Sequence, residues 1–171
     1  MNATRLLVCL AAPVTAVLIG CGPYTMKSQY RTDVRTVFVP IWTRGPDVYR
    51  RELEFRLTEA VQKQIELDTP YKITSKDRAD TELRGKIVKI EQRILSKNPD
   101  TGLPRELEET FVLAFTWEDL RTGKVLRDVQ DFRVTGTYVT AEPLNEGFFE
   151  GSEDVINRAA RRIVETMEDE W

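Results

Sequence analysis

The chain alternates between stretches with the two-residue hydrophobic period of a strand and stretches with the period of a helix. Residues 34–42 are rich in β-branched and aromatic side chains. This predicts a first strand in which Pro40 lies at the end or at an edge, because proline has no N–H to donate. The helical period then runs from Asp47, a favourable N-cap, to about Asp68. Thr69-Pro70 ends this helix because the residue before a proline avoids helical backbone angles.

A meander of strands follows a short strand at 71–74 and a polar turn. Residues 83–95 and 107–117 alternate between apolar and polar positions, as half-buried antiparallel strands do. A three-residue loop, in which Gly123 takes the left-handed position, leads to a strand at 125–139. Alternation in that strand predicts that three charged side chains face outward, namely Arg127, Asp131 and Arg133.

A second helix is predicted from Ser152, its N-cap, after an irregular connection at 141–151 that contains Phe148 and Phe149. Its apolar stripe consists of Val155, Ile156, Ala159, Ala160, Ile163, Val164 and Met167, with Trp171 one turn further on. The order of elements predicts one α+β domain over residues 34–171. We expect a two-layer sandwich, with two amphipathic helices packed on one face of a mixed, mostly antiparallel sheet of four to five strands. The other face carries polar or small side chains and stays uncovered, which invites docking.

The N-terminus has the layout of a secretory signal. Arg5 precedes an apolar run from Leu6 to Ile19, which at about 14 residues is too short to span a bilayer core of roughly 30 Å. Cys21 directly follows Leu18-Ile19-Gly20 and resembles the bacterial lipoprotein box, in which the thiol receives a diacylglycerol and the chain is cut before the cysteine. Residues 1–20 are therefore predicted to be a lipoprotein signal peptide, and residues 21–33 a lipidated tether. The alternative is an ordinary leader cut near an unmodified cysteine.

Charge and cysteine content exclude several classes of protein. Without Arg5 the mature chain has 24 basic and 28 acidic side chains, a net charge of −4, and its basic residues are interleaved with acidic ones. This pattern argues against nucleic-acid binding. Because Cys9 leaves with the leader and Cys21 takes the lipid, no intramolecular disulfide is possible. The domain must then be stabilised by ordinary packing, which 41% apolar residues allow.

The sequence contains little that could support catalysis. It has no histidine, the commonest general base and metal ligand, and its serines lie in turn or cap contexts. Paired carboxylates such as Glu108-Glu109 and Glu118-Asp119 are typical of solvated faces, and Asp77 and Asp80 lack the spacing of a calcium loop. We therefore predict a protein that is not an enzyme and that needs no cofactor or metal.

Two groups of side chains are candidates for binding. Val48 and Phe55 share the outer side of the first predicted helix, where they are either covered by a neighbouring loop or contact a partner. Lys89, Arg93, Arg127 and Arg133 project from the uncovered sheet face, with Lys86, Lys97 and Arg105 nearby. Such residues bind phosphate oxygens, although Glu91, Glu108 and Asp131 among them also allow cross-strand ion pairs.

Several segments resemble the LptE family, the lipopolysaccharide-assembly lipoproteins of the outer membrane. They span about residues 18–168 and include Gly20-Cys21-Gly22-Pro23-Tyr24, Val37-Phe38-Val39-Pro40-Ile41, Leu53-Glu54-Phe55-Arg56-Leu57-Thr58-Glu59-Ala60, Ala79-Asp80-Thr81-Glu82-Leu83-Arg84-Gly85, Asp100-Thr101-Gly102-Leu103-Pro104 and Trp117-Glu118-Asp119-Leu120-Arg121-Thr122-Gly123-Lys124. The similarity is closer to the divergent, non-enterobacterial branch of the family.

The resemblance implies a protein that plugs the lumen of an LptD-type β-barrel, helps to assemble it, and binds lipopolysaccharide during delivery to the outer leaflet. Its location would be the periplasmic face of the outer membrane, where the N-terminal lipid holds it. The alternative is a lipoprotein scaffold subunit of another envelope export or assembly machine.

Overall fold

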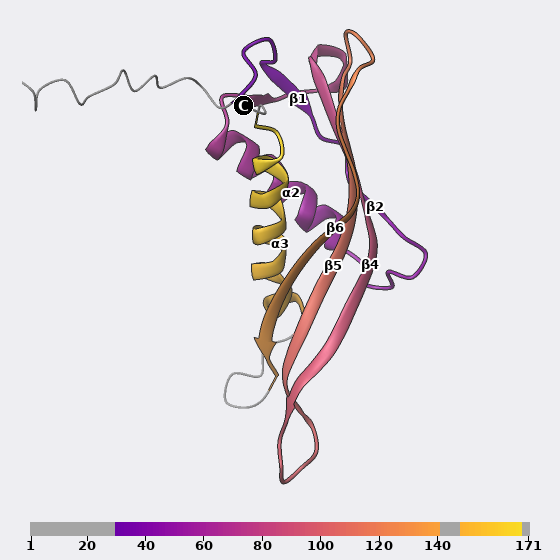
Figure 1. Cartoon of the computed structure of the whole chain (residues 1–171), viewed down its shortest axis with the longest axis vertical. Helices are drawn as coiled ribbons and strands as arrows, with labels where there is room; N and C mark the ends of the chain where they lie inside the picture. Colours follow the sequence, from indigo (N-terminus) through magenta and orange to yellow (C-terminus); the bar gives the residue numbers. More distant parts are fainter. Residues whose placement is uncertain (1–29, 141–147, 169–171) are drawn as a thin grey trace, which may run out of the picture.

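The computed structural model describes residues 30–140 and 148–168 (Figure 1). Their elements in chain order are β1 (Thr36–Phe38), β2 (Thr43–Arg44), α2 (Leu53–Asp68), β3 (Lys72–Ile73), the short 3₁₀ helix η2 (Lys76–Arg78), β4 (Thr81–Lys97), β5 (Pro104–Asp119), β6 (Val125–Val139) and α3 (Phe148–Glu165).

The strands form one mixed sheet of six strands in the order β3-β1-β4-β5-β6, with β2 also paired to β4. The pairs made by β1, β2 and β3 are parallel, whereas β4, β5 and β6 form an antiparallel meander. The predicted α+β fold is confirmed, with more strands than the expected four to five. Of the strand predicted over residues 34–42, only β1 forms, and it ends before Pro40; β2 begins just beyond the predicted range and pairs with a later position of β4.

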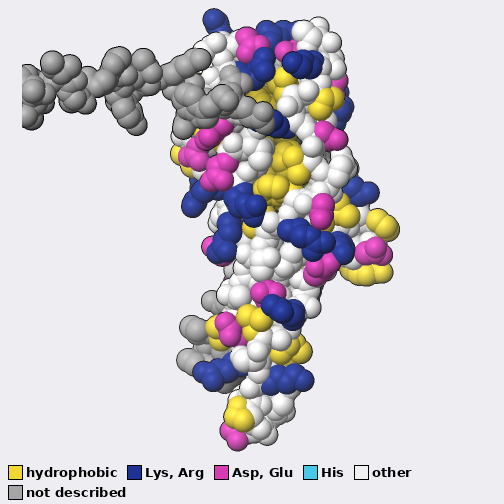
Figure 2. Space-filling view, viewed as in Figure 1, with side chains coloured by type: hydrophobic (Ala, Val, Ile, Leu, Met, Phe, Trp, Pro, Cys, Tyr) yellow, Lys and Arg dark blue, Asp and Glu magenta, His cyan; other side chains and the backbone are white. Residues whose placement is uncertain are grey.

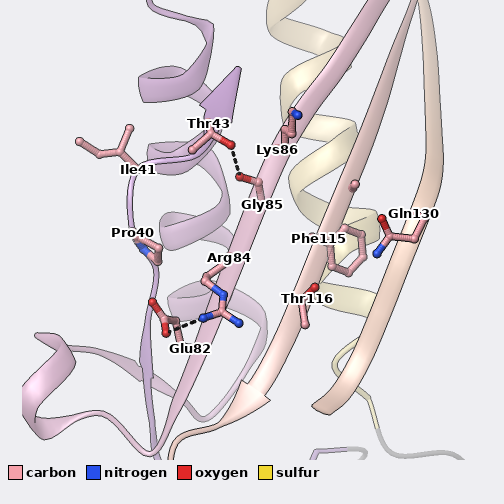
Figure 3. A pocket seen from close by; sticks show the side chains of 11 residues that line it. Pro40, Ile41, Thr43, Glu82, Arg84, Gly85, Lys86, Phe115, Thr116 and Gln130 are labelled. Atoms are coloured by element: carbon pink, nitrogen blue, oxygen red, sulfur yellow. Dashed lines mark hydrogen bonds and ion pairs between the residues drawn. The ribbon is translucent and has the colours of Figure 1, made fainter. Parts of the chain in front are cut away.

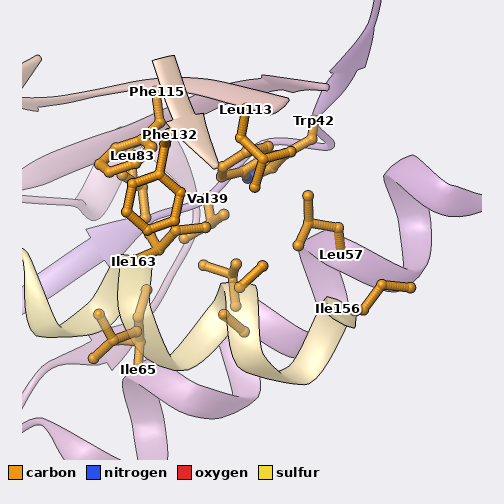
Figure 4. Close-up of a cluster of buried hydrophobic side chains, with 14 of the residues drawn as sticks. Val39, Trp42, Leu57, Ile65, Leu83, Leu113, Phe115, Phe132, Ile156 and Ile163 are labelled. Atoms are coloured by element: carbon orange, nitrogen blue, oxygen red, sulfur yellow. The ribbon is translucent and has the colours of Figure 1, made fainter. Parts of the chain in front are cut away.

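Both α-helices lie on one side of the sheet, and among the described residues no α-helix covers the other side (Figure 1). The core fills the space between the layers (Figure 4). Leu53, Leu57, Val61 and Ile65 of α2 are fully buried there, as is the whole predicted stripe of α3 from Val155 to Met167. The sheet contributes aromatic side chains, including Phe115, whose ring meets that of Phe132 edge-on at 5.3 Å between centroids.

The first helix begins later than the sequence predicts. It starts at Leu53, and Glu52 before it has a φ of 76° in the left-handed region. Asp47 is therefore not its N-cap, and Val48 lies outside the helix, where it is 5% exposed and belongs to the core. The prediction that Val48 and Phe55 share an outer helix face was wrong, because only Phe55 lies on the helix.

The last helix begins earlier than predicted. It starts at Phe148, so Ser152 lies within its second turn instead of capping it. Ser152 is fully buried, and its hydroxyl lies 2.6 Å from the Phe148 carbonyl oxygen one turn earlier, a bond that serines make inside helices. Residues 141–147 and Trp171 lie outside the described residues.

An extra residue in β6 reverses the inward and outward positions near its beginning. Leu113 of β5 pairs with Phe132, but Phe115 pairs with Val129, so three steps on β6 match two on β5. Arg127 consequently pairs with Trp117 and lies on the helix side of the sheet. The prediction that Arg127 projects from the uncovered face was wrong, because a bulge shifts the two-residue alternation by one.

Candidate functional site

We use the term open sheet face for the outward side chains of Arg84, Lys86, Lys89, Glu91 and Arg93 on β4 and for the side chains beside them on β5 and β6. The antiparallel register places Arg93 opposite Glu108, Glu91 opposite Thr110, and Lys89 opposite Val112. Val112 in turn pairs with Arg133 of β6. Three of the four predicted basic residues, namely Lys89, Arg93 and Arg133, therefore lie on one surface.

Carboxylates accompany each of these three basic residues. Arg93 lies 2.9 Å from Glu108, and Lys89 pairs with Glu91 on the same strand. Arg133 lies 3.2 Å from Glu91 and 3.1 Å from Asp131. The hydrogen bond from Lys89 is the main cause that lowers the pKa of Glu91, with a smaller contribution from Arg133. The geometry therefore contains the cross-strand ion pairs, and a phosphate would have to compete with these carboxylates.

A groove of about 500 Å³ lies on the open sheet face next to this network (Figure 3). One wall is formed by the segment between β1 and β2, which includes Pro40 and the half-exposed Ile41. The floor includes Ala114 and Thr116 of β5, and Gln130 of β6 also lines the groove. Its mixed lining suits a ligand that has an apolar part as well as a polar one.

The two cations of the groove differ in their bonding. Arg84 is 2.6 Å from Glu118 and 3.5 Å from Glu82, so its charge is already compensated. Lys86 is exposed and has no ion pair within 4 Å among the residues that the structure describes. The sequence alone indicated Lys86 as a neighbour of the basic candidate residues and did not place it among them. The strand alternation before the bulge at Val88 could have found it, because Lys86 lies two residues after Arg84.

Arg127 has a structural role on the helix side of the sheet. Its Nε donates a hydrogen bond of 3.0 Å to the carbonyl oxygen of Thr166, just after the end of α3. A cation there satisfies a carbonyl that the helix leaves free and complements the negative end of the helix dipole. Arg127 therefore does not belong with the ligand candidates.

A buried carboxylate that sequence reasoning assigned to a solvated pair lies beneath the sheet. Glu109 is fully buried; its Oε2 lies 2.6 Å from the Ser152 hydroxyl, and its Oε1 accepts a bond of 3.3 Å from the Gln92 amide. Burial raises the pKa of Glu109, and the bonds from Ser152 and Gln92 only partly oppose this. A cavity of about 230 Å³ lies nearby, lined in part by Tyr49, Ile90 and Gln92.

The remaining predicted positions have separate locations. Phe55 is 54% exposed on α2, so it remains a candidate for partner contact. Cys21 lies outside the described residues, whereas Tyr30 at the end of the predicted tether packs edge-on against Tyr71 of the domain. In the described part of the chain, no group of three or more Asp, Glu, Cys or His residues is arranged to hold a metal ion. None of the described helices is both long enough and apolar enough to span a membrane.

Comparison with known proteins connects this architecture to one family. The model of the LptE family, described as lipopolysaccharide-assembly, matches residues 34–170. The fold resembles that of uncharacterized lipoprotein B from Nitrosomonas europaea, with a TM-score of 0.52 and 20% identity over 77% of this chain and 80% of that chain. Rare lipoprotein B from Shewanella oneidensis aligns with a TM-score of 0.48 and 20% identity over 78% and 93% of the two chains. No curated protein matches the sequence.

Proposed function

Because the chain belongs to the LptE lipopolysaccharide-assembly family, we propose that it is a non-enzymatic outer-membrane lipoprotein that plugs and helps to assemble an LptD-type β-barrel. In this role it assists the delivery of lipopolysaccharide to the outer leaflet. The family match over residues 34–170, which takes in every described strand and helix, carries the proposal. The absence of histidine and the ion-paired state of the acidic residues on the open sheet face support a role without catalysis.

Attachment to the periplasmic face of the outer membrane would depend on Cys21. One acyl chain gives only marginal membrane binding, whereas two or more hold a protein stably. A diacylglycerol on the thiol would therefore keep the domain at the membrane without any apolar surface of its own. Mass spectrometry of the mature N-terminus is expected to find an acylated Cys21. An unmodified Cys21, or a retained leader, would contradict the anchor.

The open sheet face and the exposed side of α2 are the surfaces available for the barrel. An uncovered antiparallel face with satisfied ion pairs can dock on a partner surface without leaving buried charges unpaired. Phe55 adds an exposed aromatic side chain, a residue type enriched in protein interfaces. Lys89, Arg93 and Arg133 would meet the phosphates of lipopolysaccharide on the same face, in exchange for their present carboxylate partners.

The decisive experiment is affinity purification of the tagged full-length protein from membranes in a gentle detergent. We expect a large β-barrel protein to be recovered in nearly equal amounts. Phe55→Ser should reduce that recovery, whereas Leu67→Ser, which alters another exposed apolar side chain of α2, serves as the matched control. Recovery of the lipoprotein alone, at normal expression and with Cys21 acylated, would refute the barrel role.

A further inference from the structure

The two edges of the antiparallel meander are protected differently. At the β6 edge, α3 covers the free backbone: Arg158 donates a bond of 2.9 Å to the Thr135 carbonyl oxygen, and Arg162 donates one of 2.8 Å to that of Arg133. At the opposite edge, β1 and β2 pair with β4 no further than Ile87. From there to the end of β4, no strand among the described residues lies on that side. Only the end of β4 and the hairpin loop that follows it project past both helices (Figure 1).

The hydrogen bonds at the β6 edge show which backbone N–H and C=O groups of β4 point away from the sheet. Arg133 and Thr135 turn their carbonyl groups away from β5, so the residues that alternate with them bond to β5. The same alternation continues across the pairing of β5 with β4. It follows that the backbone N–H and C=O groups of Ile90, Gln92 and Ile94 point away from β5. In the described part of the chain these groups have no hydrogen-bond partner. They form a template for one more strand.

The sequence of this edge is complementary to itself. In Ile90-Glu91-Gln92-Arg93-Ile94, an antiparallel copy with Gln92 opposite Gln92 places Glu91 opposite Arg93 and Ile90 opposite Ile94. The three residues whose backbone groups point off the edge then form hydrogen-bonded pairs with the second copy. Glu91 and Arg93 fall in the non-hydrogen-bonded pairs between them, in which side chains lie closer together. The register with β5 is regular from Lys89 to Ile94, and bulges lie on both sides of this stretch.

We propose that β4 pairs with β4 of a second copy of this chain, with Gln92 on the two-fold axis. The side chains of Glu91 and Arg93 are exposed, at 44% and 70%, so both can reach across the axis. Ile94 is 45% exposed, and the position that it would face in the second copy is Ile90, which lines the cavity of about 230 Å³. Such an interface uses the same patch on both subunits and closes at two. Its backbone contacts lie along the edge of β4, although the side chains of Glu91 and Arg93 also belong to the open sheet face.

Charge reversal tests this pairing, because each single change creates two like-charge contacts in the dimer. Sedimentation velocity of the purified full-length protein in mild detergent is expected to show a monomer–dimer equilibrium. Glu91→Arg and Arg93→Glu should each weaken self-association by about tenfold or more. Lys124→Glu, which reverses an exposed charge in the β5–β6 loop, should have no effect.

The pairing makes one prediction that a merely destabilised fold would not. A mixture of the Glu91→Arg chain with the Arg93→Glu chain should form a heterodimer, because every facing charge pair is then opposite in sign. If the single variants unfold, Ile94→Pro replaces them: its lost N–H points off the sheet, so the monomer keeps its bonds while pairing is blocked. A monomer at all concentrations, a dimer indifferent to these changes, or an edge occupied only by a strand of another protein overturns the proposal. Its failure would leave barrel recovery unaffected.

Discussion

At the scale of single residues, Asp119 determines the loop between β5 and β6. Its Oδ1 accepts hydrogen bonds from the backbone N–H groups of Arg121 (2.8 Å) and Thr122 (3.1 Å), and the Arg121 guanidinium lies 2.9 Å from Oδ2. These bonds preorganise the turn in which Gly123 has a φ of 70°. The side-chain bond from Arg121 is the main cause that lowers the pKa of Asp119 to about 2.

A lowered pKa means that the folded state favours the ionised carboxylate of Asp119. Its contribution to stability is therefore complete above the ordinary value of 3.8 and disappears as the pH falls through about 2. Asp119→Ala is expected to reduce the free energy of unfolding by about 1–3 kcal/mol at pH 7, because two partly buried backbone N–H groups lose their charged acceptor. Urea titrations at pH 7 and near pH 2 should show this difference shrinking. A deficit that stays constant with pH would contradict the assignment.

Glu109 shows the opposite behaviour. The Ser152 hydroxyl has one proton but lies 2.6 Å from both Glu109 Oε2 and the Phe148 carbonyl oxygen. A protonated Glu109 can supply the second proton, which agrees with the pKa that burial raises. Since the folded state then binds the proton more tightly, stability is full below the ordinary value of 4.5 and falls as the pH rises through the folded pKa.

Replacing Glu109 with glutamine tests this behaviour, because an amide can donate to Ser152 without carrying charge. Glu109→Gln is expected to raise the free energy of unfolding by about 1 kcal/mol at pH 8, since a buried charge is removed. The gain should disappear near pH 4.5. Glu109→Ala, which abolishes the bond to Ser152, is the contrasting control and should destabilise the protein at both pH values. Equal stability of Glu109→Gln and wild type at pH 8 would show that the carboxylate is not strained by burial.

At the scale of elements, the hydrophobic period of the sequence predicted most of the secondary structure. The long strands follow from the two-residue alternation of apolar and polar positions, and the stripe of α3 follows from the helical period. The hairpin loops follow from the turn residues between the strands. Alternation cannot reveal a bulge, because one extra residue in β6 depends on how its partner strand fits; this is why Arg127 was misplaced. Helix starts were also missed, since Val48 and Ser152 are held by tertiary contacts that override local cap preferences.

The packing of the β1–β2 segment against β4 depends on a glycine. A Cβ added at Gly85 would overlap the indole ring of Trp42, which is 1% exposed and cannot move aside. Gly85→Ala is therefore expected to lower the free energy of unfolding by about 1–3 kcal/mol, a typical cost of overpacking. Gly102→Ala offers a comparison without a clash, because nothing lies within 4 Å of a Cβ there and only its φ of 72° is strained. Thermal melts of both variants should give the larger loss for Gly85→Ala.

At the scale of the whole molecule, the candidate face could be predicted because the sequence of residues 34–171 predicts two amphipathic helices to cover the sheet. One layer of helices leaves one sheet face open, whatever the details of pairing. The particular residues on that face were harder to predict. Charged side chains that alternate in sign can form ion pairs with each other or remain unpaired until a ligand binds. The sequence cannot distinguish these two states, whereas the distances between Arg93 and Glu108 and between Arg133 and Asp131 do. In Figure 2, basic and acidic side chains are interspersed over the visible surface.

Binding of phosphorylated lipid A tests whether the open sheet face contacts ligand. Arg93→Glu combined with Arg133→Glu is expected to weaken binding by about tenfold, because each reversal places a carboxylate where a phosphate would bind. Stability should change by less than about 1 kcal/mol, since both sites are exposed. Lys86→Glu should weaken binding as well, because this cation lines the groove and has no carboxylate partner among the residues that the structure describes. The measurement is lipid A binding at two salt concentrations, with Lys124→Glu as the control. If the double reversal leaves binding unchanged, Arg93 and Arg133 do not bind the ligand, and they only form cross-strand ion pairs.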